Sequence, residues 1–385
     1  MTEEHPPISV IIPTYNRAGY LSQAITSILQ QTLPPTEIIV VDDGSKDETA
    51  TIVRRMHGPI HLFRQTHRGV AAARNLGLQR ARGQIIAWLD SDDMWEPDFL
   101  TVTVAALMSD ASLGGVYTGI LLIDAEGQPT GLATRTEPPE TLYKALTRDN
   151  FIATPAMVVR KSCYDTVGNF DTQFLIAEDY DMWLRLSKQC RIQGIPRPLV
   201  RIRVHEANTM HNVDLFRDAH LALARKHFGD SKTAYGYTLR TIALKYIEMG
   251  DEQQGWHFLM QAARYHPPIL ARLDTFYELA CGHQPRGRRG RAAELNIESN
   301  ASAMMHGLDA LFDDASPEVL SMQPDAYGNA YLALAMLSDQ AGRWGPARRY
   351  LLQAIRYHPA LLRDRKIIRR MLKLIAGKRL TGKHQ

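Results

Sequence analysis

The sequence predicts a doubly wound α/β domain with a mixed sheet, followed by an all-α C-terminal region. Short apolar runs rich in β-branched residues alternate with helical patterns over the first hundred residues, as in parallel strands joined by crossover helices. Polar residues follow these runs directly, at the strand ends where open α/β sheets bind ligands. From about residue 215 the strand patterns stop, and apolar residues recur at helical period.

The elements follow in order along the chain. Strands are expected in the apolar runs at 8–13, 37–41, 60–63 and 84–89, with crossover helices at 18–31, 46–56 and 69–81. After about residue 110 the pattern becomes mixed, with strands expected within 113–124 and 154–165 and a helix over 177–190. We therefore predict one domain over residues 1–215, made of two halves, 1–110 and 111–215.

The C-terminal region, 216–385, contains an internal repeat on either side of an Arg- and Gly-rich link at 283–292. Residues 249–270 and 341–362 match with three pairs in register: Gly250 and Gly342, Tyr265 and Tyr357, Pro267 and Pro359. The two copies resemble tetratricopeptide-type helical hairpins. Because a solenoid of such repeats needs roughly three or more copies, we expect a helical appendage that packs on the first domain or on a partner protein.

Composition excludes several classes of protein. A net charge of +4 on 385 residues does not indicate a nucleic-acid partner. The three cysteines (Cys163, Cys190 and Cys281) lack CxxC spacing, which argues against a disulfide framework or a structural zinc site and favours the reducing cytoplasm. The N-terminus lacks the features of a signal peptide, and no run of about 18 apolar residues could span a bilayer. We expect a cytoplasmic protein.

Three polar segments follow expected strands and should converge on one crevice: "PTYNR" at 13–17, "DDGS" at 42–45 and "DSDD" at 90–93. Asp90 and Asp92 alternate in sequence, so an extended segment places both carboxylates on one side, as a hard divalent cation requires. Mg²⁺ or Mn²⁺ is therefore expected, with a diphosphate supplying further oxygen ligands.

Each polar segment also has a simpler interpretation. Asp92 or Asp93 could cap the helix that begins near Pro97, a residue suited to the first turn of a helix. The "DDGS" segment could be an ordinary turn, in which Asp and Gly take their usual positions. The conjunction of the segments favours a ligand site over these separate alternatives.

Residues 8 to about 210, roughly half of the chain, resemble an inverting glycosyltransferase of family 2 with the GT-A fold. Six segments carry the resemblance: "SVIIPTYNRAGYLSQAITSILQQT", "EIIVVDDGSKDET", "GVAAARNLGL", "WLDSDD", "VGNFDTQF" and "EDYDMWLRL". The resemblance implies transfer of a sugar from a nucleoside diphosphate sugar, with UDP favoured, to a hydroxyl of a glycan or lipid-linked acceptor in surface polysaccharide biosynthesis. The half at 1–110 would bind the nucleotide sugar, and the half at 111–215 would face the acceptor.

The resemblance also assigns donor-site residues. Four residues lie where the family holds the base and ribose: Pro13, Tyr15, Asp42 and Asp43. Arg74 lies where the family contacts the nucleotide or diphosphate, with a solvated helix arginine as the alternative. Asp90 and Asp92 match the DxD element, with Asp92 as the first choice for direct metal ligation. Asp93 leaves the register of that element open.

The segment "EDYDMW" supplies the expected catalytic carboxylates. By resemblance Asp179 is the base that deprotonates the acceptor hydroxyl, and Glu178 supports it. Trp183 lies four residues on, on the same helix face, and is expected to pack against the acceptor sugar. The alternative is a solvated acidic turn that opens a helix.

By resemblance His205 is a further metal ligand, with a structural histidine as the alternative. The neighbouring Arg201 and Arg203 favour a phosphate-binding rim.

Competing functions are weighed by the motifs that they would require. A nucleotidyltransferase, the less favoured enzyme alternative, would need a Gly-rich phosphate loop with a basic residue after the first strand, where this chain has "PTYNR". No GxGxxG follows an expected strand and no GxxxxGK[ST] occurs, which excludes dinucleotide oxidoreductases and P-loop NTPases. Processive polysaccharide synthases carry a Gln-x-x-Arg-Trp element at the place that corresponds to His205, and they also carry membrane spans. Neither feature is found in this sequence, which favours transfer of a single sugar over polymerisation. A non-catalytic sugar-nucleotide-binding or scaffold protein stays as the alternative. The donor sugar, the acceptor and the linkage depend on loops that the sequence does not determine.

The tail at 363–383 combines apolar residues along one helical side with many Arg and Lys residues. This pattern predicts a peripheral contact with anionic membrane, at the inner face. The alternative is that the apolar side packs on the preceding hairpin as its terminal cap.

Overall fold

The computed structural model describes residues 5–204, 212–283, 292–363 and 367–369. The chain divides into two compact units, Met1–Leu223 and Ala224–Gln385. The predicted domain division after residue 215 stays a prediction, because one continuous helix, α8 (Val213–Phe228), runs through that point. In the described residues, no helix is both long and apolar enough to cross a membrane.

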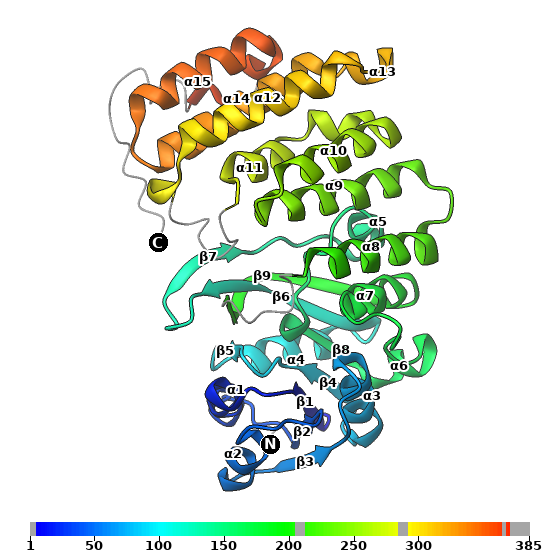
Figure 1. Ribbon diagram of the computed structural model, residues 1–385. Coiled ribbons are helices and arrows are strands. Elements are labelled where there is room, and N and C mark those ends of the chain that lie inside the picture. The colour runs from blue at the N-terminus through cyan, green and yellow to red at the C-terminus, as the bar shows by residue number, and fades with distance from the viewer. Residues whose placement is uncertain (1–4, 205–211, 284–291, 364–366, 370–385) are drawn as a thin grey trace. The chain divides into compact units, whose positions relative to one another are not determined.

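The first unit is built around one mixed sheet of nine strands (Figure 1). The strands lie in the order β3-β2-β1-β4-β8-β6-β9-β5, with β7 paired to β6. β1, β2, β3 and β4 run parallel, whereas β8 is antiparallel to both β4 and β6. The strand bounds are β1 Ile8–Thr14, β2 Glu37–Asp42, β3 Ile60–Arg64, β4 Ile85–Trp88, β5 Met94–Trp95, β6 Leu113–Ile123, β7 Pro129–Ala133, β8 Met157–Arg160 and β9 Arg191–Arg203. The predicted mixed α/β sheet is confirmed.

Helices cover both faces of the parallel strands. Val10 and Ile12 of β1 share a core cluster with Leu21, Ile25 and Ile28 of α1. On the opposite face Gly77 of α3 packs so closely that a Cβ atom there would lie 2.3 Å from Cγ2 of Ile11. The helix bounds in this unit are α1 Ala18–Leu29, α2 Thr49–Arg55, α3 Val70–Arg80, α4 Phe99–Ser109, α5 Pro139–Leu146, α6 Lys161–Val167 and α7 Glu178–Gln189. These strands are buried on both faces, which explains their continuous apolar runs.

Two predictions for the second half of this unit need correction. Residues 154–165, expected as strand, contain only the short strand β8, between a 3₁₀ turn at Thr154–Ala156 and the helix α6. The long strand β9 was not predicted. Its Pro196 and Pro198 interrupt the pattern, and the register between β6 and β9 shifts where they occur, as at a β-bulge.

The described part of the second unit is helical, as predicted. Its helices are α9 Lys232–Glu248, α10 Glu252–Tyr265, α11 Leu273–Cys281, α12 Ile297–Asp313, α13 Pro317–Leu320, α14 Gln323–Gln340 and α15 Trp344–Tyr357. The sequence repeat corresponds to two helical hairpins, α9–α10 and α14–α15. Their turns contain Gly250 with φ of 87° and Gly342 with φ of 72°, a left-handed conformation that glycine adopts readily.

Both hairpins close around a glycine opposite a histidine. A Cβ atom at Gly236 would lie 2.7 Å from Cβ of His266, and one at Gly328 would lie 2.4 Å from Cβ of His358. Such distances leave no room for a side chain, so the two copies share one tight helix–helix contact.

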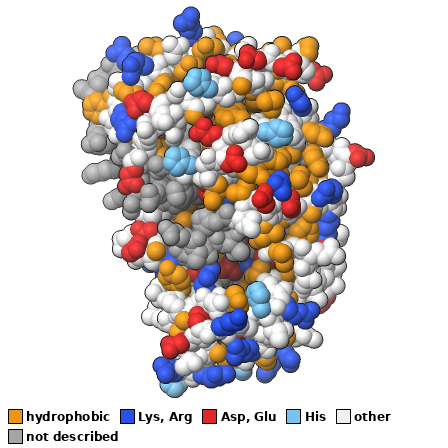
Figure 2. Space-filling view, viewed as in Figure 1, with side chains coloured by type: hydrophobic (Ala, Val, Ile, Leu, Met, Phe, Trp, Pro, Cys, Tyr) orange, Lys and Arg blue, Asp and Glu red, His pale blue; other side chains and the backbone are white. Residues whose placement is uncertain are grey.

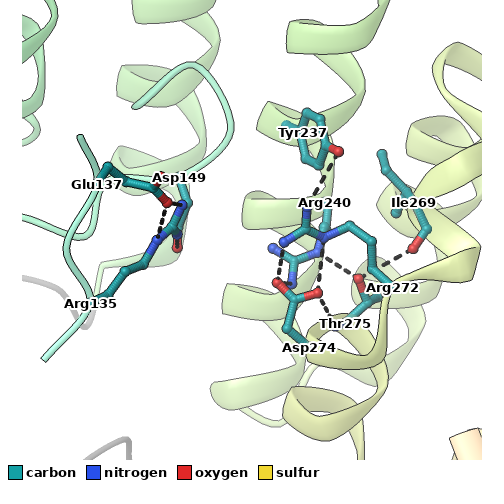
Figure 3. Close-up of polar contacts among 9 residues, drawn as sticks. All are labelled: Arg135, Glu137, Asp149, Tyr237, Arg240, Ile269, Arg272, Asp274 and Thr275. Atoms are coloured by element: carbon teal, nitrogen blue, oxygen red, sulfur yellow. Dashed lines mark hydrogen bonds and ion pairs between the residues drawn. The ribbon is translucent and has the colours of Figure 1, made fainter. Parts of the chain in front are cut away.

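Polar clusters brace each unit internally (Figure 3). In the helical unit, Nε of Arg240 on α9 donates to Oγ1 of Thr275 on α11 at 2.7 Å, and Asp274 accepts from both Arg240 and Arg272. In the first unit Arg135 pairs with Glu137. Hydrophobic side chains also reach the surface of the helical unit (Figure 2), including three on α15: Trp344, Leu352 and Tyr357.

Candidate active site

The carboxyl ends of β1, β2 and β4 meet where the strand order reverses, because β1 lies between β2 and β4. Hydrogen bonds join the loops that follow. The backbone N–H of Asn16 donates to Oγ of Ser45 at 2.9 Å, and that of Lys46 donates to Oδ1 of Asn16 at 2.8 Å. Nε of Arg17 lies 3.3 Å from Oδ2 of Asp92. The structure therefore brings together the three predicted polar strand ends.

The base and ribose residues predicted from the resemblance lie at this edge, with different exposure. Tyr15 is 36% exposed, whereas Pro13 is buried within β1. Asp42 has no exposed surface, and its Oδ1 accepts from the N–H of Ser45 at 2.8 Å. That bond is also the one expected of an ordinary turn, so the turn alternative for "DDGS" describes part of its geometry.

The carboxylate of Asp43 accepts three hydrogen bonds. Its Oδ1 accepts from Nε2 of Gln65 at 2.6 Å and from the N–H of Arg68 at 2.9 Å, and its Oδ2 accepts from the N–H of Gly69 at 2.8 Å. Nδ1 of His67 lies 2.8 Å from the same Oδ2. The remaining acceptor position, on Oδ2, is the one that the imidazole of His67 covers.

Arg74 on α3 is buried between two of the predicted motifs. Its Nη2 donates to Oδ1 of Asp90 at 2.8 Å, and its Nη1 pairs with the carboxylate of Glu178. Burial acts to lower the pKa of Arg74, and the carboxylates of Asp90 and Glu178 outweigh it, so the pKa lies above that of a free guanidinium. With 3% of its surface exposed, Arg74 is not the solvated helix arginine of the alternative interpretation. It joins "DSDD" to "EDYDMW".

The acidic loop after β4 brings three carboxylates close together, and two of them have raised pKa values. Burial raises the pKa of Asp90 against the attraction of Arg74. Burial and the charges of Asp92 and Asp90 hold the pKa of Asp93 well above its usual range. Oδ1 of Asp93 accepts from the N–H of Arg203, and the residue that caps α4 is Asp98. The interpretation of Asp92 or Asp93 as the helix cap was therefore wrong.

Asp90 and Asp92 fit a hard divalent cation by donor type. Their carboxylates are 30% and 18% exposed, and a cation would relieve the mutual repulsion of this loop. Within the described ranges, no group of three or more His, Cys, Asp and Glu side chains is arranged to hold a metal ion. The third predicted ligand, His205, lies outside the described residues.

The predicted catalytic carboxylates open α7. Oδ2 of Asp179 accepts from Oγ1 of Thr154 at 3.1 Å. Burial raises the pKa of Glu178 to about 7, despite the attraction of Arg74. The preceding Ala177 has φ of 63°, a left-handed conformation that strains a residue with a side chain. Glu178 is 6% exposed, so the alternative of a solvated acidic turn was wrong for this residue.

Trp183 does not lie where it could contact an acceptor. Its side chain has no exposed surface, and its Nε1 donates to the carbonyl oxygen of Ile152 at 3.2 Å. The helix face that it shares with Asp179 turns into the core after the first turn of α7. The prediction that Trp183 packs against the acceptor sugar was wrong for this reason.

Sequence reasoning misjudged the arginines of β9. Arg201 pairs with Glu96 at 2.6 Å. Arg203 is 3% exposed and donates to the carbonyl oxygen of Ala125 at 2.7 Å and to Oε1 of Gln23 at 2.9 Å. Both arginines therefore bind protein groups and do not form a free phosphate rim. Their alternation in "RIR" could have indicated a strand.

Comparison with known proteins identifies a glycosyltransferase domain in this chain. Residues 9–166 match glycosyl transferase family 2, and this part of the chain is a domain of that family. An uncharacterised glycosyltransferase of Rickettsia typhi is 31% identical over 211 residues, which cover 53% of this chain and 66% of that protein. A chondroitin synthase of Pasteurella multocida is 27% identical over 237 residues, which cover 60% of this chain and 24% of that protein.

This chain thus spans 66% of the Rickettsia protein and 24% of the synthase, which is less than two thirds of each. Among solved structures, residues 1–349 of S. aureus TarS align over 97% of this chain and 92% of that chain. The identity is 17% and the TM-score is 0.44.

Proposed function

We propose that this chain is a metal-dependent inverting glycosyltransferase that moves a single sugar from a UDP sugar to a hydroxyl of a glycan or lipid-linked acceptor. One observation supports this most strongly. Arg74 binds Asp90, a candidate metal ligand, and Glu178, the neighbour of the candidate base Asp179. Arg74 thus links the acidic loop, proposed to face the leaving diphosphate, to the start of α7, where the proposed base lies next to Glu178.

The roles follow from the positions of these residues. Asp90 and Asp92 would hold Mg²⁺ or Mn²⁺, with His205 as a further ligand, and the ion would neutralise the charge of the departing diphosphate. Asp179 takes the proton from the acceptor hydroxyl, held in orientation by Thr154. Glu178 and Arg74 fix the start of α7 against the acidic loop. Residues at the ends of β1 and β2 receive the nucleoside: Pro13, Tyr15, Asp42 and Asp43.

The proposed setting is polysaccharide assembly in the cytoplasm. Two relatives are named chondroitin synthases, which supports a glycan acceptor for this chain as well. The cysteines Cys163, Cys190 and Cys281 are free, which suits a reducing compartment. The exposed Trp344, Leu352 and Tyr357 of α15 supply an apolar surface for a protein partner.

Metal dependence is the first test. Release of UDP from a panel of UDP sugars, measured with and without chelator, should require Mg²⁺ or Mn²⁺. Asp92→Asn should lower turnover by about 100-fold or more, because the ion stabilises several kcal/mol of developing charge. Asp98→Asn is the matched control, since this half-exposed aspartate pairs with Arg197 outside the acidic loop, and it makes no side-chain hydrogen bond at the N-cap of α4 that Asn would lose. Full activity in excess chelator would overturn the proposal.

Membrane contact through residues 363–383 is a separate part of the proposal. Most of that segment lies outside the described residues. Ile367 packs against a cluster that contains Leu332 and Leu351, which supports the alternative of a terminal cap. Cosedimentation with anionic and neutral liposomes decides between them. Binding to anionic vesicles that is lost on removing residues 370–385 supports membrane contact, whereas absent or unchanged binding rules it out.

A further inference from the structure

The imidazole of His67 covers one face of the Tyr15 ring. The two ring centroids lie 4.1 Å apart, and the planes meet at 21°. His67 belongs to the segment between β3 and α3, whereas Tyr15 follows β1. The side chain of His67 is 56% exposed and Tyr15 is 36% exposed, so packing in the core does not force the rings together.

The same imidazole lies against Asp43. Nδ1 of His67 makes a hydrogen-bond contact with the backbone carbonyl oxygen of Asp43 at 3.2 Å, and it lies 2.8 Å from Oδ2 of the same residue, so it covers one side of the carboxylate. The other donors to Asp43 are the side chain of Gln65 and the backbone N–H groups of Arg68 and Gly69. The backbone donors are fixed at the start of α3. His67 is therefore the exposed donor that a ligand can replace most easily.

A pyrimidine base with a ring N–H makes the same two contacts. It offers a flat face for stacking on Tyr15, as the imidazole of His67 does, and an in-plane donor for the Oδ2 atom of Asp43 that Nδ1 of His67 covers. We propose that His67 is a built-in occupant of the base subsite, and that the base of the donor nucleotide binds by displacing it. This inference rests on the proposed function, in which Tyr15 and Asp43 receive the base.

Displacement of His67 requires rotation of its side chain only. A Cβ atom at Gly44 would lie 2.9 Å from the backbone nitrogen of His67, so the backbone there is packed closely against the "DDGS" loop. The imidazole itself extends toward solvent. Rotation about its side-chain bonds frees the ring of Tyr15 and one acceptor position on Asp43 without moving α3. When a side chain of the protein itself occupies the subsite most of the time, the ligand binds only the molecules in which the subsite is open. The apparent Kd is then the intrinsic Kd divided by the fraction of open molecules.

Calorimetric titration with UDP tests the inference. His67→Ala should bind UDP about tenfold more tightly than the unmodified chain, as expected when a state nine-tenths closed becomes open. His67→Phe, which keeps the stacking on Tyr15 without the N–H donor, should give an intermediate Kd. His61→Ala is the matched control, because His61 is an exposed histidine of β3 that lies 4.0 Å from Glu37. Its Kd should equal that of the unmodified chain.

The outcomes separate the inference from the proposed function. If His67→Ala binds UDP with unchanged or lower affinity, and its Tm is unchanged, the displacement is overturned. His67 would then be a residue that lines the subsite and stays in place when the nucleotide binds. If UDP binds neither the unmodified chain nor any of the three variants, the proposed donor is refuted, and the proposed displacement is refuted with it. Histidine-labelled protein adds a direct readout, since the His67 resonances, assigned by their loss in His67→Ala, should shift when UDP is added.

Discussion

Removal of the Arg74 guanidinium should destabilise the first unit strongly and in a pH-dependent manner. Arg74 is 3% exposed, and it binds Asp90 and Glu178 directly. Arg74→Met keeps an unbranched side chain, shorter than that of Arg, but leaves both carboxylates without their cation. Loss of one partner from a buried ion pair typically costs about 3–5 kcal/mol. We expect a decrease of this size in the free energy of unfolding at pH 8.

The decrease in the free energy of unfolding should be smaller at pH 6 than at pH 8, because Glu178 titrates between these values. Burial holds the pKa of Glu178 at about 7 in the folded chain, above its ordinary 4.5. A carboxyl with a raised pKa binds its proton more tightly when folded, so its contribution to stability falls as the pH rises from about 4.5 to 7. Without Arg74 this pKa rises further. At pH 6 Glu178 is mostly protonated even with Arg74 present, so Arg74→Met removes the cation from Asp90 alone. At pH 8 the substitution also leaves the ionised carboxylate of Glu178 without its partner, and the loss is larger.

Urea denaturation at pH 6 and pH 8, followed by tryptophan fluorescence, measures both effects. Trp88, Trp95 and Trp183 report on the first unit. Arg80→Met is the matched control, because this arginine lies on the same helix and is exposed. Its guanidinium lies over the ring of Phe63, so its loss should change stability by no more than about 1 kcal/mol. A loss below about 1 kcal/mol for Arg74→Met, or an equal loss at both pH values, would refute the reasoning.

Three further substitutions test the start of α7. Asp179→Asn should abolish sugar transfer and leave the Kd for UDP unchanged, since a base acts on the acceptor; a collapse of UDP affinity would assign Asp179 to the donor site. Trp183→Phe should cost about 1–2 kcal/mol of stability through the lost bond to Ile152, with the acceptor KM unchanged; a raised KM would restore a role in acceptor binding. Ala177→Gly should stabilise the fold by up to about 1 kcal/mol by relieving the left-handed strain, and should lower kcat because Glu178 and Asp179 are held less firmly. For Ala177→Gly, urea denaturation measures the stability and initial rates measure kcat. A loss of stability in this variant would contradict the prediction.

The parallel half of the fold could be predicted because each of its main strands is a continuous apolar run. β1, β2 and β4 are buried on both faces, so their sequences show no alternation and few polar residues. The convergence of their carboxyl ends followed from the sheet geometry alone. For that reason Tyr15, Asp43 and Asp90 could be expected together before any coordinates were known.

The acceptor-side half was harder to predict, for physical reasons that differ between residues. β9 contains two prolines and four arginines, two of them exposed, so it lacks the apolar pattern of a strand. Helical spacing placed Trp183 and Asp179 on one face, but it does not determine which turn of that face is covered by the core. The contact of Arg74 with Glu178 joins residues that lie 104 positions apart, and charge pairs at such separation leave no local trace.

The helix α3 connects recognition of the donor to chemistry through a single rigid body. At its start the backbone N–H groups of Arg68 and Gly69 hold Asp43, and its second turn carries Arg74, which holds Asp90 and Glu178. Gly77 then fixes the helix against β1 without space for adjustment. A sugar diphosphate without its base would leave the first of these contacts unengaged. The base, far from the bond that breaks, should therefore contribute to the rate of transfer as well as to affinity.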